Sequence, residues 1–182
     1  MSGGHGHIDG SNKNIAVLIA CLAALLAICE MGAKSSQTAV LTEHVEATNT
    51  WGFFQAKTIR QTIVRVAAEE VEAQYKTQEM PAAVKEQVAK WKATFDRYEN
   101  EAGEGRIDLA KSAKAHAAKR EVARLAYHMF EYGSAAFQLA IVLCSAAAVT
   151  SVMALAFLGG GLGVLGAALM ALGFFAPTLL HL

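Results

Sequence analysis

The sequence predicts an all-α membrane protein with three transmembrane helices and a long antiparallel helical hairpin, a coiled-coil-like stalk, between the first and the second. Three observations predict this fold. Residues 132–182 contain no Lys, Arg, Asp or Glu, whereas a charged side chain at mid-bilayer costs about 3 kcal/mol. A second apolar run occupies residues 15–29. Between these runs lie most of the charged residues, with apolar positions that recur at helical spacing.

The first apolar run follows a short polar tail, residues 1–14. His5 and His7 in this tail are weak candidates for metal binding, because imidazoles bind transition metals. A flexible tail holds no rigid site, so we expect no metal and no cofactor. Residues 15–33 are expected to be the first transmembrane helix. A signal peptide is the alternative, but no small-residue cleavage site follows the apolar run at the right distance.

Residues 34–131 are the predicted stalk, with 15 of the 16 basic and 14 of the 16 acidic residues. No proline interrupts residues 35–79, and Pro81 then marks the start of a second helix. Beyond Pro81 an apolar seam advances by alternating steps of four and three residues, which is typical of helices that pack as a coiled coil. The seam comprises Val84, Val88, Trp91, Phe95 and Tyr98. A glycine-rich break at 103–105 separates this helix from a third, and the stalk is either straight or folded at the break.

Residues 132–158 and 162–180 are expected to be the second and third transmembrane helices. The turn between them is expected at Gly159-Gly160-Gly161, because each glycine costs a helix about 1 kcal/mol relative to Ala. Glycines on one face of the last helix would allow another helix to approach closely in lipid. This helix-packing face comprises Gly159, Gly163, Gly166 and Gly173. Packing within the chain is one explanation, but the second span is also rich in small residues, so we expect self-association.

The distribution of basic residues predicts the topology. Five of them lie within about 20 residues of the second span, and Lys13 is the only one on the opposite side of the first span. The five are Lys111, Lys114, Lys119, Arg120 and Arg124. By the positive-inside rule, the stalk is expected in the cytoplasm and the N-terminus outside.

Two long stretches also carry a family resemblance. They are EATNTWGFFQAK at 46–57 and AYHMFEYGSAAFQ at 126–138, and the glycine-rich last span with its ending Phe175-Ala176-Pro177 extends the likeness over nearly the whole chain. The chain resembles a bacterial domain-of-unknown-function family of small three-span inner-membrane proteins with a helical hairpin between the first and second spans. The resemblance implies this architecture and a bacterial inner membrane. It carries no activity, ligand or catalytic residue.

Two groups of residues are candidate sites. Glu30, Lys34, His128 and Glu131 lie where apolar spans meet the cytoplasmic side, and carboxylates at that depth could bind an ion or pass protons. Alternatively, Glu30 pairs with Lys34 one helical turn away and Glu131 lies in interfacial water.

The second group is a polar and aromatic patch in the stalk that could bind a ligand or a lipid headgroup. It comprises Asn49, Trp51, Phe54, Gln55 and Lys57. Aromatic residues at helical spacing also fit a helix-packing core, and we favour that interpretation for this patch.

The formal net charge is zero, so nothing favours nucleic acid as a partner. We expect the lipid bilayer, further copies of the chain and possible other membrane proteins as partners. No phosphate-binding loop and no nucleophile beside an evident base is found in the sequence, so an enzyme is not expected. The sequence favours a non-enzymatic, homo-oligomeric membrane assembly or scaffold protein. The alternative is a small homo-oligomeric ion or proton channel or transporter that uses the acidic residues at the membrane boundary.

Overall fold

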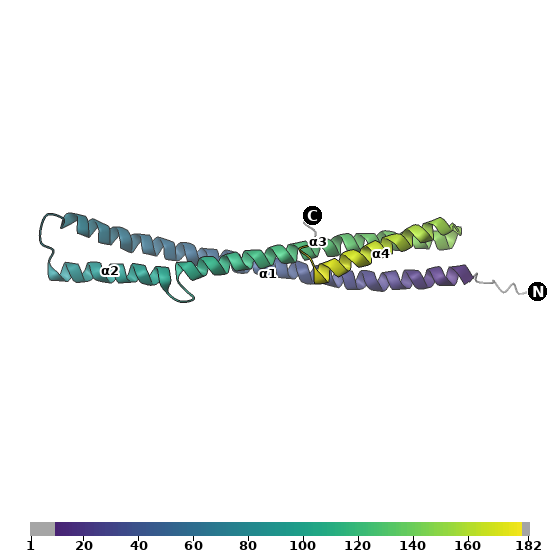
Figure 1. The fold of residues 1–182 in the computed structure, drawn as a ribbon, viewed down its shortest axis with the longest axis horizontal. Helices are drawn as coiled ribbons and strands as arrows, with labels where there is room; N and C mark the ends of the chain where they lie inside the picture. The colour runs from purple at the N-terminus through teal and green to yellow at the C-terminus, as the bar shows by residue number, and fades with distance from the viewer. Residues whose placement is uncertain (1–9, 180–182) are drawn as a thin grey trace, which may run out of the picture. The chain divides into compact units, whose positions relative to one another are not determined.

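The structure is a computed structural model that describes residues 10–179. Its helices, in chain order, are α1 (Gly10–Gln74), α2 (Ala82–Asn100), α3 (Arg106–Thr150) and α4 (Met153–Phe175) (Figure 1). No strand occurs within the described range, which confirms the predicted all-α fold. α1, α3 and α4 are long and apolar enough to cross a membrane, judged by length and composition.

Proline and glycine decide where the connections lie. Pro81 precedes α2 with an extended backbone, and its carbonyl accepts the first two hydrogen bonds of that helix. Between α2 and α3, Gly103 adopts a left-handed φ of 77°, which glycine does at little steric cost. Its backbone N–H donates a hydrogen bond of 2.8 Å to the Asp108 carboxylate. The helix break predicted at 103–105 is therefore confirmed.

The chain divides into two compact units. The first, named the apolar unit, consists of Met1–Val40 and Glu121–Leu182, and the second, named the charged unit, is Leu41–Arg120. α1 and α3 each contribute residues to both units, whereas α2 lies in the charged unit and α4 in the apolar unit.

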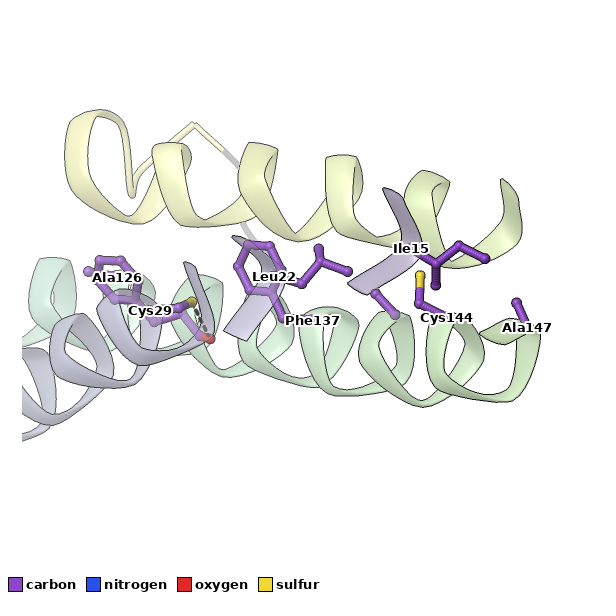
Figure 2. Close-up of a cluster of buried hydrophobic side chains, with 9 residues drawn as sticks. Ile15, Leu22, Cys29, Ala126, Phe137, Cys144 and Ala147 are labelled. Carbon is purple, nitrogen blue, oxygen red and sulfur yellow. Dashed lines mark hydrogen bonds between the residues drawn. The ribbon is translucent and has the colours of Figure 1, made fainter. Parts of the chain in front are cut away.

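The core of the apolar unit is formed by small and apolar side chains of α1 and α3, with partly buried residues of α4 packed against them (Figure 2). Phe137, Cys29 and Cys144 are completely buried. The Cys29 thiol donates a hydrogen bond of 3.2 Å to the carbonyl oxygen of Phe130, which is the dashed line in Figure 2. The core members are Ile15, Leu22, Cys29, Ala126, Phe130, Phe137, Ala140, Cys144 and Ala147.

The turn predicted at the three consecutive glycines is wrong. Helix α3 ends at Thr150, Ser151 has a left-handed φ of 58°, and Gly159-Gly160-Gly161 lie inside α4. Ser and Thr favour turns because their hydroxyls bond to nearby backbone groups; here the Thr150 hydroxyl accepts a hydrogen bond of 3.4 Å from the N–H of Val152. The shift divides the charge-free segment more evenly, into lengths of about 28 Å in α3 and about 34 Å in α4.

One side of α1 is buried or half-buried along nearly its whole length. The positions follow alternating steps of three and four residues, as in a coiled coil, except for two successive steps of four at Gly32, Ser36 and Val40. Such an irregular step locally unwinds a coiled-coil pattern, and it falls where the two units meet along α1. In the charged unit these positions are Glu43, Ala47, Thr50, Phe54, Lys57, Gln61, Val64, Ala68, Val71 and Tyr75.

The seam predicted on α2 also faces inward. Val88 is buried, and Val84, Trp91, Phe95 and Tyr98 are half-buried. The contacts between α1 and α2 are those of antiparallel helices, because lower-numbered residues of α1 meet higher-numbered residues of α2. Glu72 pairs with Lys92 at 2.5 Å, and Gln61 donates to the carbonyl oxygen of Phe95 at 3.4 Å. The seam is thus occupied within the charged unit.

Candidate functional site

The four residues predicted at the membrane boundary are only partly brought together. His128 Nδ1 lies 3.4 Å from the Glu131 carboxylate, and the His128 ring stacks on Tyr132 with centroids 6.3 Å apart. Glu30 and Lys34 are exposed, and within residues 10–179 neither forms a hydrogen bond or ion pair with the other, with His128 or with Glu131.

Metal binding has no assembled site in the described part of the chain, where no three His, Cys, Asp or Glu side chains lie close enough to hold an ion. His5 and His7, the candidates in the N-terminal tail, lie outside the described residues.

The polar and aromatic patch divides between two faces of α1. Trp51, Phe54 and Lys57 are half-buried, whereas Asn49 and Gln55 are exposed. Trp51 and Phe54 pack edge to face with centroids 5.2 Å apart. The aromatic half of the patch therefore belongs to the packing of the charged unit, and the amide side chains lie on its surface.

A polar network that the sequence did not indicate lies where α1 meets the end of α2 and the start of α3. Gln61 is almost completely buried and donates a hydrogen bond of 2.7 Å to the Glu99 carboxylate. Arg106 donates to the amide oxygen of Gln61 at 2.7 Å, to Glu99 at 2.6 Å and to the Thr58 hydroxyl at 2.9 Å. The Arg106 guanidinium also lies 5.1 Å from the centroid of the Phe54 ring, within cation–π range.

A second ion pair extends this network. The side chain of Lys57 is largely buried. Its ammonium group lies 2.9 Å from the Glu101 carboxylate and 3.7 Å from that of Glu104. The hydrogen bond from Lys57 and its positive charge lower the pKa of Glu101 below its ordinary value. Lys57 also lies 5.8 Å from the centroid of the Tyr98 ring.

Every charge of this network has a partner of opposite sign, which determines what the network can do. Both cations are held by carboxylates, so neither is available to attract an anionic ligand. The network instead ties together three helices at defined positions, and polar groups at core positions of helical assemblies are known to fix register. The sequence signal that could have indicated this polar network is Gln61, a polar residue at a seam position of α1 between Phe54 and Val64.

The helix-packing face of α4 is used within the apolar unit. A Cβ atom added at Gly159 would lie 2.6 Å from Sγ of Cys144 in α3, and one added at Gly163 would lie 2.5 Å from Cδ2 of Leu22 in α1. Real Cβ atoms do not approach other atoms so closely, so a side chain at either position would displace its neighbour, which at Gly163 is the end of the Leu22 side chain.

The other two glycines of this face make equivalent approaches. A Cβ at Gly166 would lie 3.1 Å from the carbonyl oxygen of Gly133, and one at Gly173 would lie 2.9 Å from the Phe130 ring. By contrast, a Cβ at Gly160 or at Gly161 would meet nothing within 4 Å. The contacts of this glycine face in the structure are with α1 and α3 of the same chain.

Comparison with protein families adds one result. A family model described as Domain of unknown function (DUF4337) matches residues 11–176. The chain belongs to the DUF4337 family. No curated protein and no solved structure matches this DUF4337 chain. The matched range includes the whole of α2, α3 and α4 and nearly all of α1, so both units belong to the DUF4337 domain.

Proposed function

We propose that the chain is a three-span protein of a bacterial inner membrane and that it works there as a non-enzymatic, homo-oligomeric scaffold. The apolar parts of α1 and α3, together with α4, cross the bilayer. Residues 34–131 form a long antiparallel helical hairpin with coiled-coil packing, located in the cytoplasm, while the N-terminus lies outside. The partners are lipid, further copies of the chain and other membrane proteins.

The observation that carries this proposal is the continuity of α1 and α3. Each helix contains a segment apolar enough to span a membrane and, without any non-helical residue, a segment of the charged unit. Independent domains are usually joined by exposed flexible linkers. A helix that continues directly from a membrane span attaches the charged unit to that span without a separate linker, which suits a scaffold.

Aromatic packing at one end of the apolar unit also supports membrane insertion. Phe130 and Phe174 pack edge to face with ring centroids 4.7 Å apart, and Phe175 follows at 6.4 Å from Phe174. Aromatic residues gather at membrane–water interfaces. Tyr127 and Tyr132 flank the same position on α3, near the basic residues that favour a cytoplasmic location.

The channel alternative has less support. It relies on a cluster of Glu30, Lys34, His128 and Glu131, of which only the last two approach each other. A channel also needs a continuous hydrated path, and the centre of the apolar unit is filled by Phe137, Leu22 and other apolar side chains.

The proposal is tested by carbonate extraction of membranes that contain the full chain, followed by cysteine labelling. We expect the chain to stay in the membrane pellet. With Cys21 replaced by Ser, Ala102→Cys should be protected from an impermeant thiol reagent in intact cells, whereas Ser2→Cys should be labelled. Release by carbonate would contradict membrane insertion, and the reverse labelling pattern would contradict the orientation. A native-membrane pull-down with mass measurement then identifies stoichiometry and partners.

A further inference from the structure

The face of α1 that points away from α2 and α3 in the charged unit carries an exposed apolar stripe. Its five large side chains are between 50% and 62% exposed, although they lie on a helix whose opposite side is packed. At 100° per residue they fall on one side of α1, opposite the seam that contains Gln61. This outer α1 stripe comprises Leu41, Val45, Ile59, Ile63 and Val66.

The surroundings of the stripe carry little charge. Residues 47–56 contain no Lys, Arg, Asp or Glu, although the charged unit as a whole is rich in them. Beside the middle of the stripe the exposed residues include the neutral polar Thr48, Asn49 and Gln55, and Arg60 is an exposed charge next to Ile59. Residues 47–56 therefore place no like charge against an identical stripe on another copy of the chain.

Gly52 provides a second and independent observation. It lies seven residues after Val45 and seven before Ile59, so it occupies the middle of the stripe. Glycine weakens a helix interior relative to alanine, and a Cβ at Gly52 would meet nothing within 4 Å in this chain. No contact inside the protomer therefore requires a glycine at this position, whereas close approach of another backbone would require one.

We infer that the outer α1 stripe is the surface through which two copies of the chain associate, with their α1 helices parallel and Gly52 at the closest approach. The inference rests on the proposed membrane anchoring, because copies inserted in one membrane with one topology have α1 helices that run in the same direction. Val45, Gly52, Ile59 and Val66 are each one heptad apart, so in a parallel pair each meets its own counterpart.

The stripe is long enough for two helices to meet at both of its ends. From Leu41 to Val66 a helix extends about 38 Å, and large apolar side chains lie toward each end with Gly52 between them. Confinement to the same bilayer raises the effective concentration of the two copies and strengthens such a contact further. The other apolar surfaces first considered for association, the glycine face of α4 and the α2 seam, are already occupied within the chain.

A membrane surface fits the stripe less well. Helices that lie on a bilayer usually carry Lys and Arg along the polar face beside the apolar one. In α1, Arg60 is the one basic residue near the centre of the stripe whose side chain is exposed, since Lys57 is held by Glu101. A second copy of α1 is therefore the occupant that the chemistry favours.

The test uses the full chain in native-like lipid nanodiscs and measures the dimer fraction by native mass spectrometry. Ile59→Lys and Ile59→Glu should each lower the dimer fraction about tenfold or more, because a charge is placed against its own counterpart in the pair. When the two variants are expressed together, dimers that contain one copy of each should return. Ala93→Lys, an exposed alanine on α2, is the matched control and should leave the dimer fraction unchanged.

Gly52→Leu separates association from folding. It should remove the dimer while leaving the thermal midpoint of the protomer unchanged or higher, because leucine favours the helix and its Cβ would meet nothing within 4 Å in the same chain. In a Cys21→Ser background, Val66→Cys should form a disulfide-linked dimer under mild oxidation only if the two α1 helices run parallel and in register.

The outcomes distinguish this inference from the proposed function. A wild-type dimer that survives Ile59→Lys and Gly52→Leu overturns the stripe as the interface and leaves self-association through another surface. A chain that is monomeric before any substitution overturns both the stripe and the homo-oligomeric part of the proposed function. A monomer in which a lipid-soluble photoreagent labels the outer α1 stripe would identify a lipid surface as the occupant and overturn the inference. Carbonate extraction of the same samples tests the membrane anchoring separately.

Discussion

The three consecutive glycines of α4 allow a sharp test of its packing, because Gly159 is tightly packed whereas Gly161 faces open space. A methyl group at Gly161 would meet nothing within 4 Å, whereas at Gly159 it would lie 2.6 Å from Sγ of Cys144 and 2.9 Å from the carbonyl oxygen of Ala140. Gly161→Ala should therefore gain up to about 1 kcal/mol from helix propensity alone. Gly159→Ala gains the same term, but the overpacking that it causes costs about 1–3 kcal/mol.

The backbone oxygen of Ala140 belongs to a helix and does not move as easily as a side chain, so the upper part of that range applies. We expect Gly159→Ala to lower the free energy of unfolding by about 1–2 kcal/mol and the two variants to differ by about 2–3 kcal/mol. Far-UV circular dichroism during an SDS titration of the protein in mixed micelles measures this difference.

A rescue variant completes the experiment. Cys144→Ala removes the sulfur that the new methyl group would meet, so Gly159→Ala should be less destabilising in that background, with the contact to the Ala140 carbonyl remaining. Equal shifts for Gly159→Ala and Gly161→Ala in the native background would refute the packing of α4 on α3 through Gly159.

Three further predictions concern the charged unit. Because Lys57 holds the pKa of Glu101 below its ordinary value, the pair stabilises the unit at neutral pH, and this contribution is lost as the pH falls through that lowered pKa. Lys57→Met should abolish this part of the acid sensitivity of the thermal midpoint, and an unchanged pH profile would show that the pair is not formed. Gln61→Ala and Arg106→Ala should be non-additive, with a coupling energy of about 0.5–3 kcal/mol in a double-mutant cycle of chemical denaturation; additivity would disprove the network. Trp91 lines an open groove of about 380 Å³, so Trp91→Ala should destabilise by about 1–3 kcal/mol, less than a fully buried tryptophan, and no change would mean that the α2 seam is unpacked.

Much of the helical pattern was predictable because it depends on local chemistry. The absence of charge after Glu131 and the start of α2 after Pro81 are of this kind, as is the left-handed Gly103. The location of the turn before α4 was not predictable from helix propensity. Helix propensity is a weak predictor that tertiary packing often overrides, and glycine is tolerated in transmembrane helices. The propensity argument placed the turn at Gly159–Gly161. In the structure these glycines lie inside α4, and Gly159 packs closely against Cys144.

The candidate sites were harder to predict because their geometry depends on which helices become neighbours. Glu99 and Arg106 are seven residues apart and meet Gln61 only because the chain reverses direction between α1 and α2. The sequence marks each as an ordinary polar residue of a charged segment. Likewise, the spacing of Asn49 and Trp51 does not reveal that one is exposed and the other half-buried.

The polar network has a consequence for how the chain avoids misalignment. Because the seams of α1 and α2 repeat every seven residues, sliding one helix along the other by about 10 Å would restore most apolar contacts. The slipped hairpin would, however, separate Gln61 from Glu99 and Arg106 and leave the almost completely buried Gln61 amide without these hydrogen-bond partners, which is unfavourable. Hydrophobic pairing alone would leave several nearly equal alignments, and these few hydrogen bonds select one of them. A newly made chain thus has a means of rejecting shifted hairpins.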